Sequence, residues 1–339
     1  MSDTSVRDTV HDMFGPALLA SAAVFHGTPV APEQTPWLVT LTRAHEVCGG
    51  ALIAPDRVLT AAHCVQGADP GKLSVRLRGV RHAWRGAIFP RSYREIPSPV
   101  APDDPSASAT VDDLAVILLR APVHGVTPLA IASPPPVVGE TTLTVGRGAT
   151  GPPPNQTPPN VAYSAAQQVS DACATAYEPR LFHPDRHLCT LDPTPNASQA
   201  CAGDSGSPVM VMRNGAWAVA GVVTWGGETH GRGCGEGLPD VSERVGAHLD
   251  LLSAQRTVAP WAERRVRVRR SGAVRRCVIG AWHPSGATFK VRWWRRGKSG
   301  RLTYLAGSGT TRRLSRAAGC SVTATTAGGW ATEVSYNQV

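Results

Sequence analysis

The 339-residue sequence contains no hydrophobic run long enough to cross a membrane. Its apolar stretch near the start, residues 13–25, is shorter than the roughly 20 residues that a transmembrane helix needs, so no transmembrane segment is expected. The stretch ends in small residues, as the hydrophobic part of a signal peptide does, but Asp3, Asp8 and Asp12 make a poor basic region before it. We expect residues 1–23 to be a signal or pro-segment of a secreted protein; a misassigned start codon is the alternative.

Cysteine pairs of the Cys-x-x-Cys type are also absent, which argues against a zinc site and against thioredoxin-like redox chemistry. The sequence therefore predicts no metal and no cofactor. The cysteines form an even and widely spaced set, which favours disulfides and an oxidising compartment over separate buried thiols. The eight are Cys48, Cys64, Cys173, Cys189, Cys201, Cys234, Cys277 and Cys320.

Lysine is scarce, and acidic residues nearly vanish from the last part of the chain. Only three of the 34 basic residues are lysine. Residues 1–261 hold 18 basic and 23 acidic residues, whereas residues 262–339 hold 16 basic and two acidic residues. This asymmetry predicts two modules with different partners. No nucleic-acid-reading motif accompanies the basic part, so specific nucleic-acid binding is not expected.

Helical periodicity is nearly absent as well. Short runs of strand-forming residues alternate with turns rich in Gly and Pro. Residues 243–256 have the apolar spacing of a closing helix, with Val245, Leu249, Leu251 and Leu252 on its core face. This pattern predicts an all-β fold with a short helix at the end of the first module. The expected strands of that module include 35–42, 48–53, 57–62, 114–119, 208–213 and 216–225.

One stretch, residues 202–208, surrounds a serine with glycines. The glycines beside Ser205 imply a tight turn whose main chain encloses the hydroxyl, and the N–H groups of such a turn can bind an oxyanion. Taken alone, such a cluster is more often a surface loop. Two residues elsewhere give it more weight: His63 ends an apolar strand, and Asp113 leads into the buried run 114–117.

A carboxylate that leads into an apolar strand is unfavourable unless a partner binds it. A histidine N–H is such a partner, and holding that tautomer is the task of the aspartate in a Ser-His-Asp triad. Asp112 competes for this role, but strand alternation directs its side chain away from the face of Asp113. Together with Ser205, His63 and Asp113 therefore predict nucleophilic catalysis.

Three motifs around these residues resemble the chymotrypsin/trypsin family of serine peptidases. They are Thr-Ala-Ala-His-Cys at 60–64, Asp-Leu-Ala-Val at 113–116 and Gly-Asp-Ser-Gly-Ser-Pro at 203–208. Supporting matches are Pro36-Trp37, Cys48-Gly49-Gly50, Thr224-Trp225-Gly226 and Pro239-Asp240-Val241. The resemblance covers about residues 24–256. It implies two six-stranded β-barrels with the site between them, so we expect a trypsin-like domain over residues 24–258.

By this resemblance Ser205 is the nucleophile, His63 the general base, and Asp113 the residue that orients His63. The main-chain N–H groups of Gly203 and Ser205 are expected to form the oxyanion hole. The resemblance also implies polypeptide substrates. Its disulfide pattern corresponds here to Cys48–Cys64, Cys173–Cys189 and Cys201–Cys234.

The resemblance assigns four residues to the primary substrate pocket. Gln199 stands at its base, where trypsin has an aspartate, and Gly226 leaves the wall open to a long side chain. Asp240 stands where the trypsin pattern has a glycine, so its carboxylate is able to pair with an Arg or Lys side chain. Thr224 replaces the serine that usually precedes Trp225. We expect cleavage after Arg or Lys; the alternative is that Asp240 turns to a local N–H or to solvent.

The family's mature amino terminus aligns with Val24. After cleavage, the Val24 ammonium is expected to pair with Asp204 and to order the pocket. A buried Asp204 without a partner is costly, so the uncleaved chain is expected to be poorly active. Two residues depart from the pattern: His26 replaces a glycine, and Ala23 precedes the junction where Arg or Lys is usual.

Residues 264–339 are expected to form a basic accessory domain. Trp293 lies between Cys277 and Cys320, which is typical of an immunoglobulin sandwich with a disulfide, and the surrounding residues resemble bacterial immunoglobulin-like domains. The many arginines predict binding to an anionic cell-wall or surface polymer. A solvated sheet surface without a partner is the alternative.

Two classes of function fit these patterns. The first is a secreted serine endopeptidase with an accessory domain. The second is a binding or adhesion protein on an inactive protease scaffold, attached to polyanionic surfaces by its basic domain. The complete set of Ser205, His63 and Asp113 favours the first.

Overall fold

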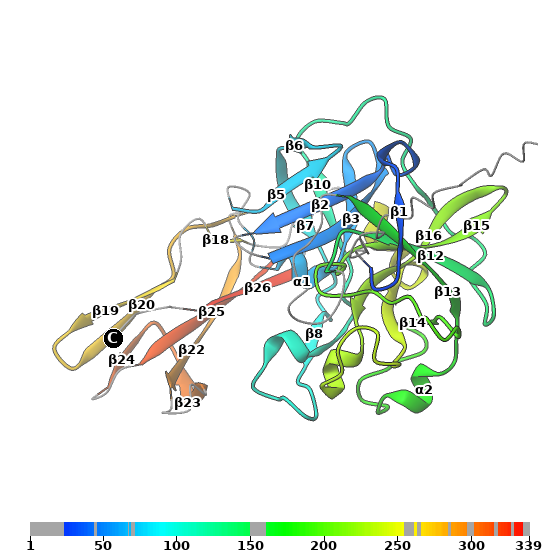
Figure 1. The fold of residues 1–339 in the computed structure, drawn as a ribbon. Helices are drawn as coiled ribbons and strands as arrows, with labels where there is room; N and C mark the ends of the chain where they lie inside the picture. The colour runs from blue at the N-terminus through cyan, green and yellow to red at the C-terminus, as the bar shows by residue number, and fades with distance from the viewer. Residues whose placement is uncertain are drawn as a thin grey trace, which may run out of the picture.

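The structure, a computed structural model, has an all-β architecture with short helices (Figure 1). It describes residues 24–334 except 44, 45, 67, 69–71, 150–160, 254–260, 263–265, 284, 285, 297–301, 315–317, 327 and 328. The predicted signal or pro-segment, 1–23, lies outside the described residues. No helix in the described part of the chain has the length and apolar character needed to span a membrane.

The first sheet holds seven strands and stays open, so the first of the two predicted barrels is a half-barrel. Strand β10 is buried at every residue, as its continuous apolar run predicts. The two ends of the path, β6 and β7, are not paired with each other in the described residues. In spatial order the strands are β6 (Val80–His82), β5 (Ser74–Leu77), β2 (Leu38–Arg43), β3 (Glu46–Ala54), β4 (Arg57–Thr60), β10 (Ala115–Leu119) and β7 (Trp84–Ile88).

The second sheet closes into a six-stranded barrel because β13 pairs with both β12 and β14. Two further strands extend it: β1 pairs with β13, and β11 pairs in parallel with β16. Strands β15 and β16, which pair as a hairpin, have the bounds expected from the sequence. The strands are β1 (Thr28–Val30), β13 (Ala162–Val169), β12 (Thr141–Gly146), β15 (Pro208–Arg213), β16 (Ala216–Trp225), β17 (Asp240–Arg244), β14 (His187–Leu191) and β11 (Ala130–Ile131).

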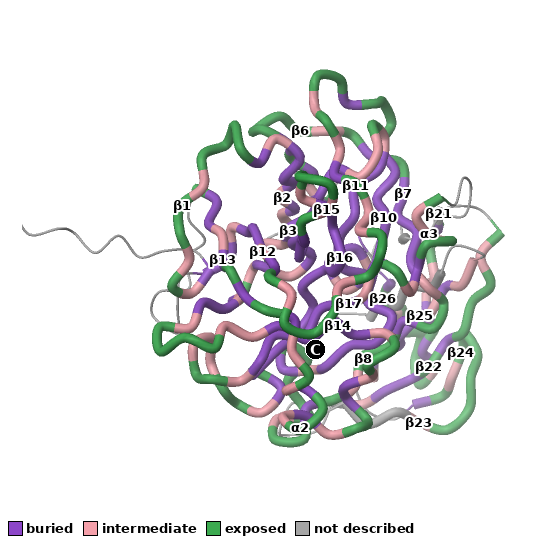
Figure 2. Tube along the Cα trace, turned by 90° about the vertical axis from the view of Figure 1, so that its right-hand side faces the viewer, coloured by how far each residue is buried: buried purple, intermediate pink, exposed green. Residues whose placement is uncertain are grey.

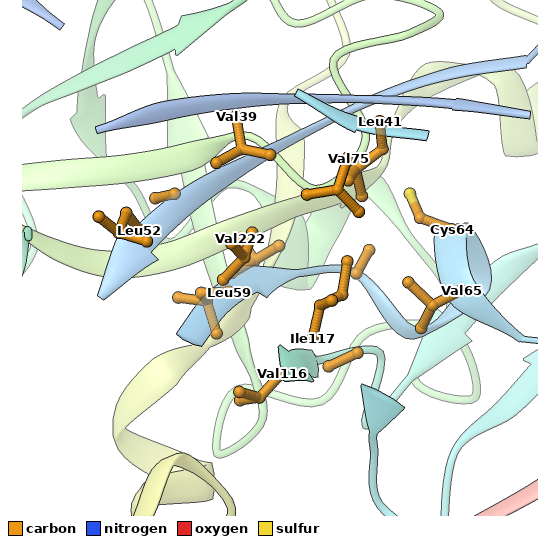
Figure 3. Packing of buried hydrophobic residues seen from close by; sticks show 14 of the residues in the cluster. Val39, Leu41, Leu52, Leu59, Cys64, Val65, Val75, Val116, Ile117 and Val222 are labelled. Carbon is orange, nitrogen blue, oxygen red and sulfur yellow. The ribbon is translucent and has the colours of Figure 1, made fainter. Parts of the chain in front are cut away.

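Both sheets contribute to one hydrophobic cluster (Figure 3). Leu41, Leu59 and Ile117 of the first sheet belong to the same cluster as Val222 of the second. Burying a side chain of this size contributes about 1.5–3 kcal/mol, so the shared cluster is the main term that holds the two sheets together. Figure 2 shows these strands buried and the connecting loops exposed.

Two predicted boundaries around the short helices are wrong. The strand expected over 57–62 ends at Thr60, and the chain turns into helix α1 (Ala62–Val65). The helix expected over 243–256 is a strand end followed by a 3-10 turn (Val245–His248) and helix α3 (Leu249–Ser253). Val245 is fully buried as predicted, but Leu249 is 56% exposed. A 3-10 turn winds three residues per turn, and this shifts the faces that a period of 3.6 predicts.

Smaller elements complete the first module. Strands β8 (Arg94–Ile96) and β9 (Ala109–Val111) form a two-stranded sheet just before Asp113. Helix α2 (Cys173–Ala176) begins at a disulfide-bonded cysteine. Further 3-10 turns cover Pro32–Gln34, Pro105–Ala107 and Gly227–His230.

The C-terminal part has its own hydrophobic cluster, which contains Cys277, Trp293 and Cys320. A disulfide joins Cys277 on β20 to Cys320 on β25, and Trp293 is 1% exposed beside it. The immunoglobulin-like assignment stays a prediction. The strands are β18 (Trp261–Ala262) with β21 (Trp282–His283), β19 (Arg267–Ser271) with β20 (Val274–Val278) and β24 (Thr311–Arg313), and β23 (Leu302–Ser308) with β22 (Thr288–Arg296), β25 (Gly319–Thr326) and β26 (Gly329–Val334).

Candidate active site

His63 lies in α1, directly after β4 leaves the first sheet. A disulfide between Cys64 and Cys48 ties this helix to β3. Its imidazole Nδ1 is 2.7 Å from Asp113 Oδ2, and its main-chain N–H donates to Asp113 Oδ1 at 2.9 Å. The position of His63 is therefore fixed by a covalent link on one side and by Asp113 on the other.

Asp113 lies between β9 and β10 and is fully buried. Thr110 Oγ1 donates a further hydrogen bond to its Oδ2 at 2.8 Å. Burial raises the pKa of Asp113, but the adjacent His63 and the hydrogen bonds to the carboxylate outweigh it, and the net pKa shift is downward. Burial lowers the pKa of His63, whereas the charge and hydrogen bond of Asp113 raise it, and the net pKa shift is upward. The pair thus favours an ionised carboxylate next to an imidazole that readily takes a proton.

Asp112 does not contact His63. Its φ of 57° lies in the left-handed region, and its side chain is buried beside Arg186 and His248. Residues other than glycine rarely adopt the left-handed backbone conformation, so contacts with neighbouring residues hold the turn at Asp112.

Ser205 lies in a tight turn between the Cys201–Cys234 disulfide and β15. The turn needs glycine because Gly203 has φ of 94° and Gly206 has φ of 83°. An added Cβ on Gly206 would come within 2.3 Å of Thr60 Oγ1. Gly49 on β3 donates its N–H to the Ser205 carbonyl at 2.7 Å, which fixes the turn against the first sheet.

The main-chain N–H groups of Gly203 and Ser205 have no acceptor among the described residues. The neighbouring donors are used: Asp204 N–H donates to Cys201, and Gly206 N–H donates to Val223. Gly203 and Ser205 both line the same cavity. Two free N–H groups at one cavity wall are able to bind an oxyanion.

A cavity of about 620 Å³ contains both Ser205 and His63 in its lining. Within the part of the chain that the structure describes, no hydrogen bond joins the two side chains, and His63 Nε2 lies 3.5 Å from Cys64 Sγ. Catalytic hydrogen bonds are often long without a substrate and tighten in the complex.

Three of the four residues expected in the substrate pocket line this cavity: Thr224, Gly226 and Asp240. Gln199 does not, because its amide donates to Leu238 O and accepts from the Gly235 N–H. Gln199 therefore links the main chain at Leu238 to the main chain at Gly235 beside the pocket.

Asp240 is 4% exposed, and its Oδ2 accepts from Ala200 N at 3.0 Å and from Gln167 Nε2 at 2.8 Å. Its Oδ1 would lie 3.4 Å from a Cβ on Gly226, on the open wall of the pocket. Burial raises the pKa of Asp240 to about 7, although these hydrogen bonds oppose the shift.

The segment expected to hold the mature terminus is docked beside the pocket. Val24 is fully buried and packs with Tyr163 and Ala165. Phe25 and Gln199 exchange main-chain hydrogen bonds at 2.8 and 3.1 Å. His26 has φ of 52°, so it occupies a conformation that the glycine of the family pattern adopts without strain.

Asp204 is fully buried and accepts from Gly148 N at 2.7 Å and from Cys201 N at 3.0 Å. Burial raises the pKa of Asp204 to about 7 against these two hydrogen bonds. Glycines at 146 and 148 make room for it, since an added Cβ would come within 2.0 and 2.5 Å of its carboxyl group.

Sequence reasoning missed Thr110, Glu228 and Glu243. Thr110 donates to Asp113, and its position three residues upstream was the available signal. Glu228 lines the cavity and accepts from Gly226 N at 2.9 Å, close after the Thr-Trp-Gly motif. Glu243 accepts the main-chain N–H of Asp113 at 3.0 Å from far along the chain, and no local pattern indicates this.

Two clusters among the described residues have metal-ligand spacing. In the first, Cys48 and Cys64 are bonded to each other, so their sulfurs are not free thiolates. In the second, His248 Nε2 lies 2.8 Å from Glu243 Oε1 and 3.8 Å from Asp112 Oδ1. A histidine between two carboxylates accounts for that cluster without an ion.

Comparison with known proteins agrees with this geometry. A family model described as Trypsin matches residues 24–251, which span both sheets of the first module. A protein described as Trypsin from Saccharopolyspora erythraea is 30% identical over 229 residues, which make up 66% of this chain and 93% of that protein. The matched range contains Ser205, His63 and Asp113 with the disulfides around them. The chain belongs to the trypsin family and carries a serine-peptidase domain.

Proposed function

We propose that the chain is a secreted serine endopeptidase that uses Ser205, His63 and Asp113 as a triad. The observation that carries the proposal is the 2.7 Å contact between His63 Nδ1 and a fully buried Asp113, at a cavity that Ser205 also lines. Four disulfides suit an extracellular compartment.

The chemistry follows from the donors and acceptors at the cavity. His63 Nε2 takes the proton of Ser205 as Oγ attacks the scissile carbonyl, while Asp113 holds the Nδ1 proton and stabilises the imidazolium. The N–H groups of Gly203 and Ser205 bind the oxyanion of the tetrahedral intermediate. His63 then protonates the leaving amine. Water takes the place of the amine and attacks the acyl-enzyme, while His63 accepts the proton of water and returns a proton to Ser205 as the acyl group leaves.

Covalent labelling with a fluorescent organophosphonate tests the triad on chain processed to expose Val24. We expect labelling and amide hydrolysis in the wild type and neither in Ser205→Ala. The matched control is Ser92→Ala, because Ser92 is an exposed serine of the same module. An unlabelled wild type with a free Val24 terminus would favour the inactive-scaffold alternative.

We further propose a preference for Arg or Lys before the cleaved bond, read by Asp240. The support is its place in the cavity lining, where Oδ1 faces the open wall at Gly226. Because the pKa of Asp240 is raised to about 7, its negative charge and hence the preference for Arg or Lys should grow as pH rises through that value.

The ratio of kcat/KM for matched Arg and norleucine substrates measures the preference at each pH, since titration of the triad cancels in the ratio. We expect Asp240→Asn to flatten the pH dependence of the ratio; a ratio that rises equally in the variant would contradict the assignment.

Activation through Val24 is part of the proposal. A free ammonium at Val24 would supply the positive charge that buried Asp204 lacks in the uncleaved chain. We expect the uncleaved chain to hydrolyse amides far more slowly than processed chain, with active-site titration giving the fraction of competent sites.

A second candidate function, attachment to an anionic cell-wall or surface polymer, rests on arginines in the C-terminal sheet of β19, β20 and β24. Arg269 lies opposite Arg276, and both are exposed. Arg270, Arg275 and Arg312 form a second cross-strand row on the other face of the sheet, where Arg275 is 7% exposed and its guanidinium donates to Gly272 O. Like charges directly opposite each other are unfavourable in a sheet, and within the described residues neither Arg269 nor Arg276 has an acidic partner. A polyanion would supply the missing countercharge.

Retention on immobilised inorganic polyphosphate tests this attachment, with the full chain in a Ser205→Ala background. Arg269→Ser/Arg276→Ser should elute at lower salt than wild type, because fewer phosphate contacts release fewer counterions. The control is Arg78→Ser/Arg81→Ser, which removes two exposed arginines of the first sheet. Equal losses in both double variants would point to net charge rather than to this surface.

A further inference from the structure

Next to the Asp113 main chain lies a buried group of ionisable residues that the catalytic mechanism does not use. Glu243 of β17 is fully buried, and His248 of the following 3-10 turn is 4% exposed. His248 Nε2 donates to Glu243 Oε1 at 2.8 Å, since a carboxylate oxygen accepts. Buried charges of this kind are costly unless each finds a partner, so the group needs an explanation.

The other oxygen of Glu243 reaches the triad. Glu243 Oε2 accepts the main-chain N–H of Asp113 at 3.0 Å. This N–H falls between the end of β9 and the start of β10, outside both strand ladders. Without Glu243 it would be an unpaired donor in the interior, which costs free energy comparable to a lost hydrogen bond.

The backbone at this point also needs support. Asp112 has φ of 57°, so the chain enters Asp113 through a conformation that persists only where the surroundings impose it. Asp112 Oδ1 faces Arg186 Nη1 at 3.5 Å and His248 Nε2 at 3.8 Å. His248 thus lies between the carboxylate of the strained residue and the carboxylate that binds the next N–H.

A second set of contacts fixes Thr110, the donor to Asp113 Oδ2. Its carbonyl accepts from His187 Nε2 at 3.0 Å and from Trp225 Nε1 at 3.1 Å. His187 Nδ1 accepts from His183 N, so His187 is neutral with its proton on Nε2. Burial lowers the pKa of His187 to about 4, which agrees with that form. His187 and Glu243 are cross-strand neighbours in β14 and β17, so adjacent residues of the second barrel make both sets of contacts.

We propose that Glu243 is a positioning residue of the triad: held by His248, it accepts the Asp113 main-chain N–H and so fixes the carboxylate that faces His63. The proposal rests on the triad assigned above. Glu243 acts on the triad through the hydrogen bond that its Oε2 accepts from the Asp113 main-chain N–H. A glutamine keeps this acceptor: its amide oxygen accepts from Asp113 N, and its NH2 group donates to His248 Nε2 once the imidazole proton moves to Nδ1.

Three variants test this role in processed full-length chain, with kcat expressed per active site titrated by a burst reagent. Glu243→Ala removes the acceptor, and we expect kcat per site to fall by about 10–100-fold with KM nearly unchanged, as misplaced catalytic groups produce. Glu243→Gln should restore kcat per site to within about threefold of wild type, because it retains the acceptor. The control Ser242→Ala alters the adjacent buried residue of β17, and it should keep wild-type kcat per site.

A merely structural role predicts a different result: fewer titratable sites, each with wild-type kcat. That outcome in Glu243→Ala overturns the proposal, and so does a glutamine variant as slow as the alanine variant. If Glu243→Ala does not fold, His248→Ala is measured in its place. A lower kcat per site at unchanged KM would support the proposal, and a wild-type kcat per site would refute it. Activity that survives in Ser205→Ala would instead overturn the proposed function itself, so the two failures are distinguishable.

Discussion

Both oxygens of the Asp113 carboxylate have defined donors. Oδ1 accepts from the His63 main chain, and Oδ2 accepts from the His63 ring and from Thr110 Oγ1. Thr224, which precedes Trp225, donates to Val241 O and not to Asp113. Thr110 is therefore the one hydroxyl donor that Asp113 has among the described residues.

Replacing Thr110 with valine removes this donor at nearly constant volume. A hydrogen bond to a charged group is worth about 1.5–3 kcal/mol, so we expect kcat to fall by about 10–100-fold. Steady-state kinetics on a fluorogenic amide, normalised by active-site titration, measures the loss. Thr110→Ser keeps the hydroxyl and should retain most of the activity; an equal loss in the serine variant would assign the effect to packing.

At the scale of elements, the turn that carries Ser205 is packed tightly against β3. An added Cβ on Gly49 would come 2.1 Å from Ser207 Oγ and 2.9 Å from Ser207 Cα. Ser207 is fully buried and belongs to the same turn as Gly203 and Ser205. The conformation of this turn thus depends on a glycine in another strand.

Gly49→Ala should therefore distort the turn and destabilise the fold. Overpacking of this kind costs about 1–3 kcal/mol, and we expect a lower midpoint in urea unfolding together with slower phosphonate labelling of Ser205. The control is Gly246→Ala, where an added Cβ meets nothing within 4 Å and the backbone is not left-handed. Wild-type stability and labelling in Gly49→Ala would show that the strand and the turn separate easily.

The sequence was sufficient to predict the elements whose signals are local. The motifs around His63, Asp113 and Ser205 each occupy a few residues, and the buried run of β10 and the hairpin of β15 and β16 follow short-range patterns. The contact from Glu243 to Asp113 joins residues 130 positions apart, and only the tertiary fold brings β17 next to the connection between β9 and β10. The exposure of Leu249 was missed for a related reason, since a 3-10 turn shifts the helical faces without altering the apolar spacing.

The whole molecule has an unevenly distributed charge, and its two modules have separate hydrophobic clusters, several in the first and one in the second. Within the first module, the uncleaved chain also buries acidic groups with raised pKa, chief among them Asp204. Because its folded pKa of about 7 lies above the ordinary value of 3.8, the folded state holds a proton that the unfolded state releases between these values. Its contribution to stability is thus present at pH 4 and lost as pH rises through 7.

Asp204→Asn should remove this loss in the uncleaved chain. In a Ser205→Ala background, the stability difference between the two proteins should change by on the order of 3–4 kcal/mol between pH 4 and pH 8. Urea unfolding with disulfides intact measures it, and Asp250→Asn is the control because Asp250 is exposed. A constant difference across this range would mean that Asp204 already has a cationic partner before cleavage.

Asp113 forms hydrogen bonds with both halves of the peptidase domain: its carboxylate accepts from His63 and Thr110 of the first half, and its main-chain N–H donates to Glu243 of the closed barrel. In the proposed triad, the set of contacts around the acid is therefore complete only once the last strand of that barrel, β17, is in place. A nascent or partly unfolded chain lacks this support however complete its first half is. We therefore expect proteolytic activity to appear only after the closed barrel has folded, so that a nascent chain does not cleave unfolded copies around it.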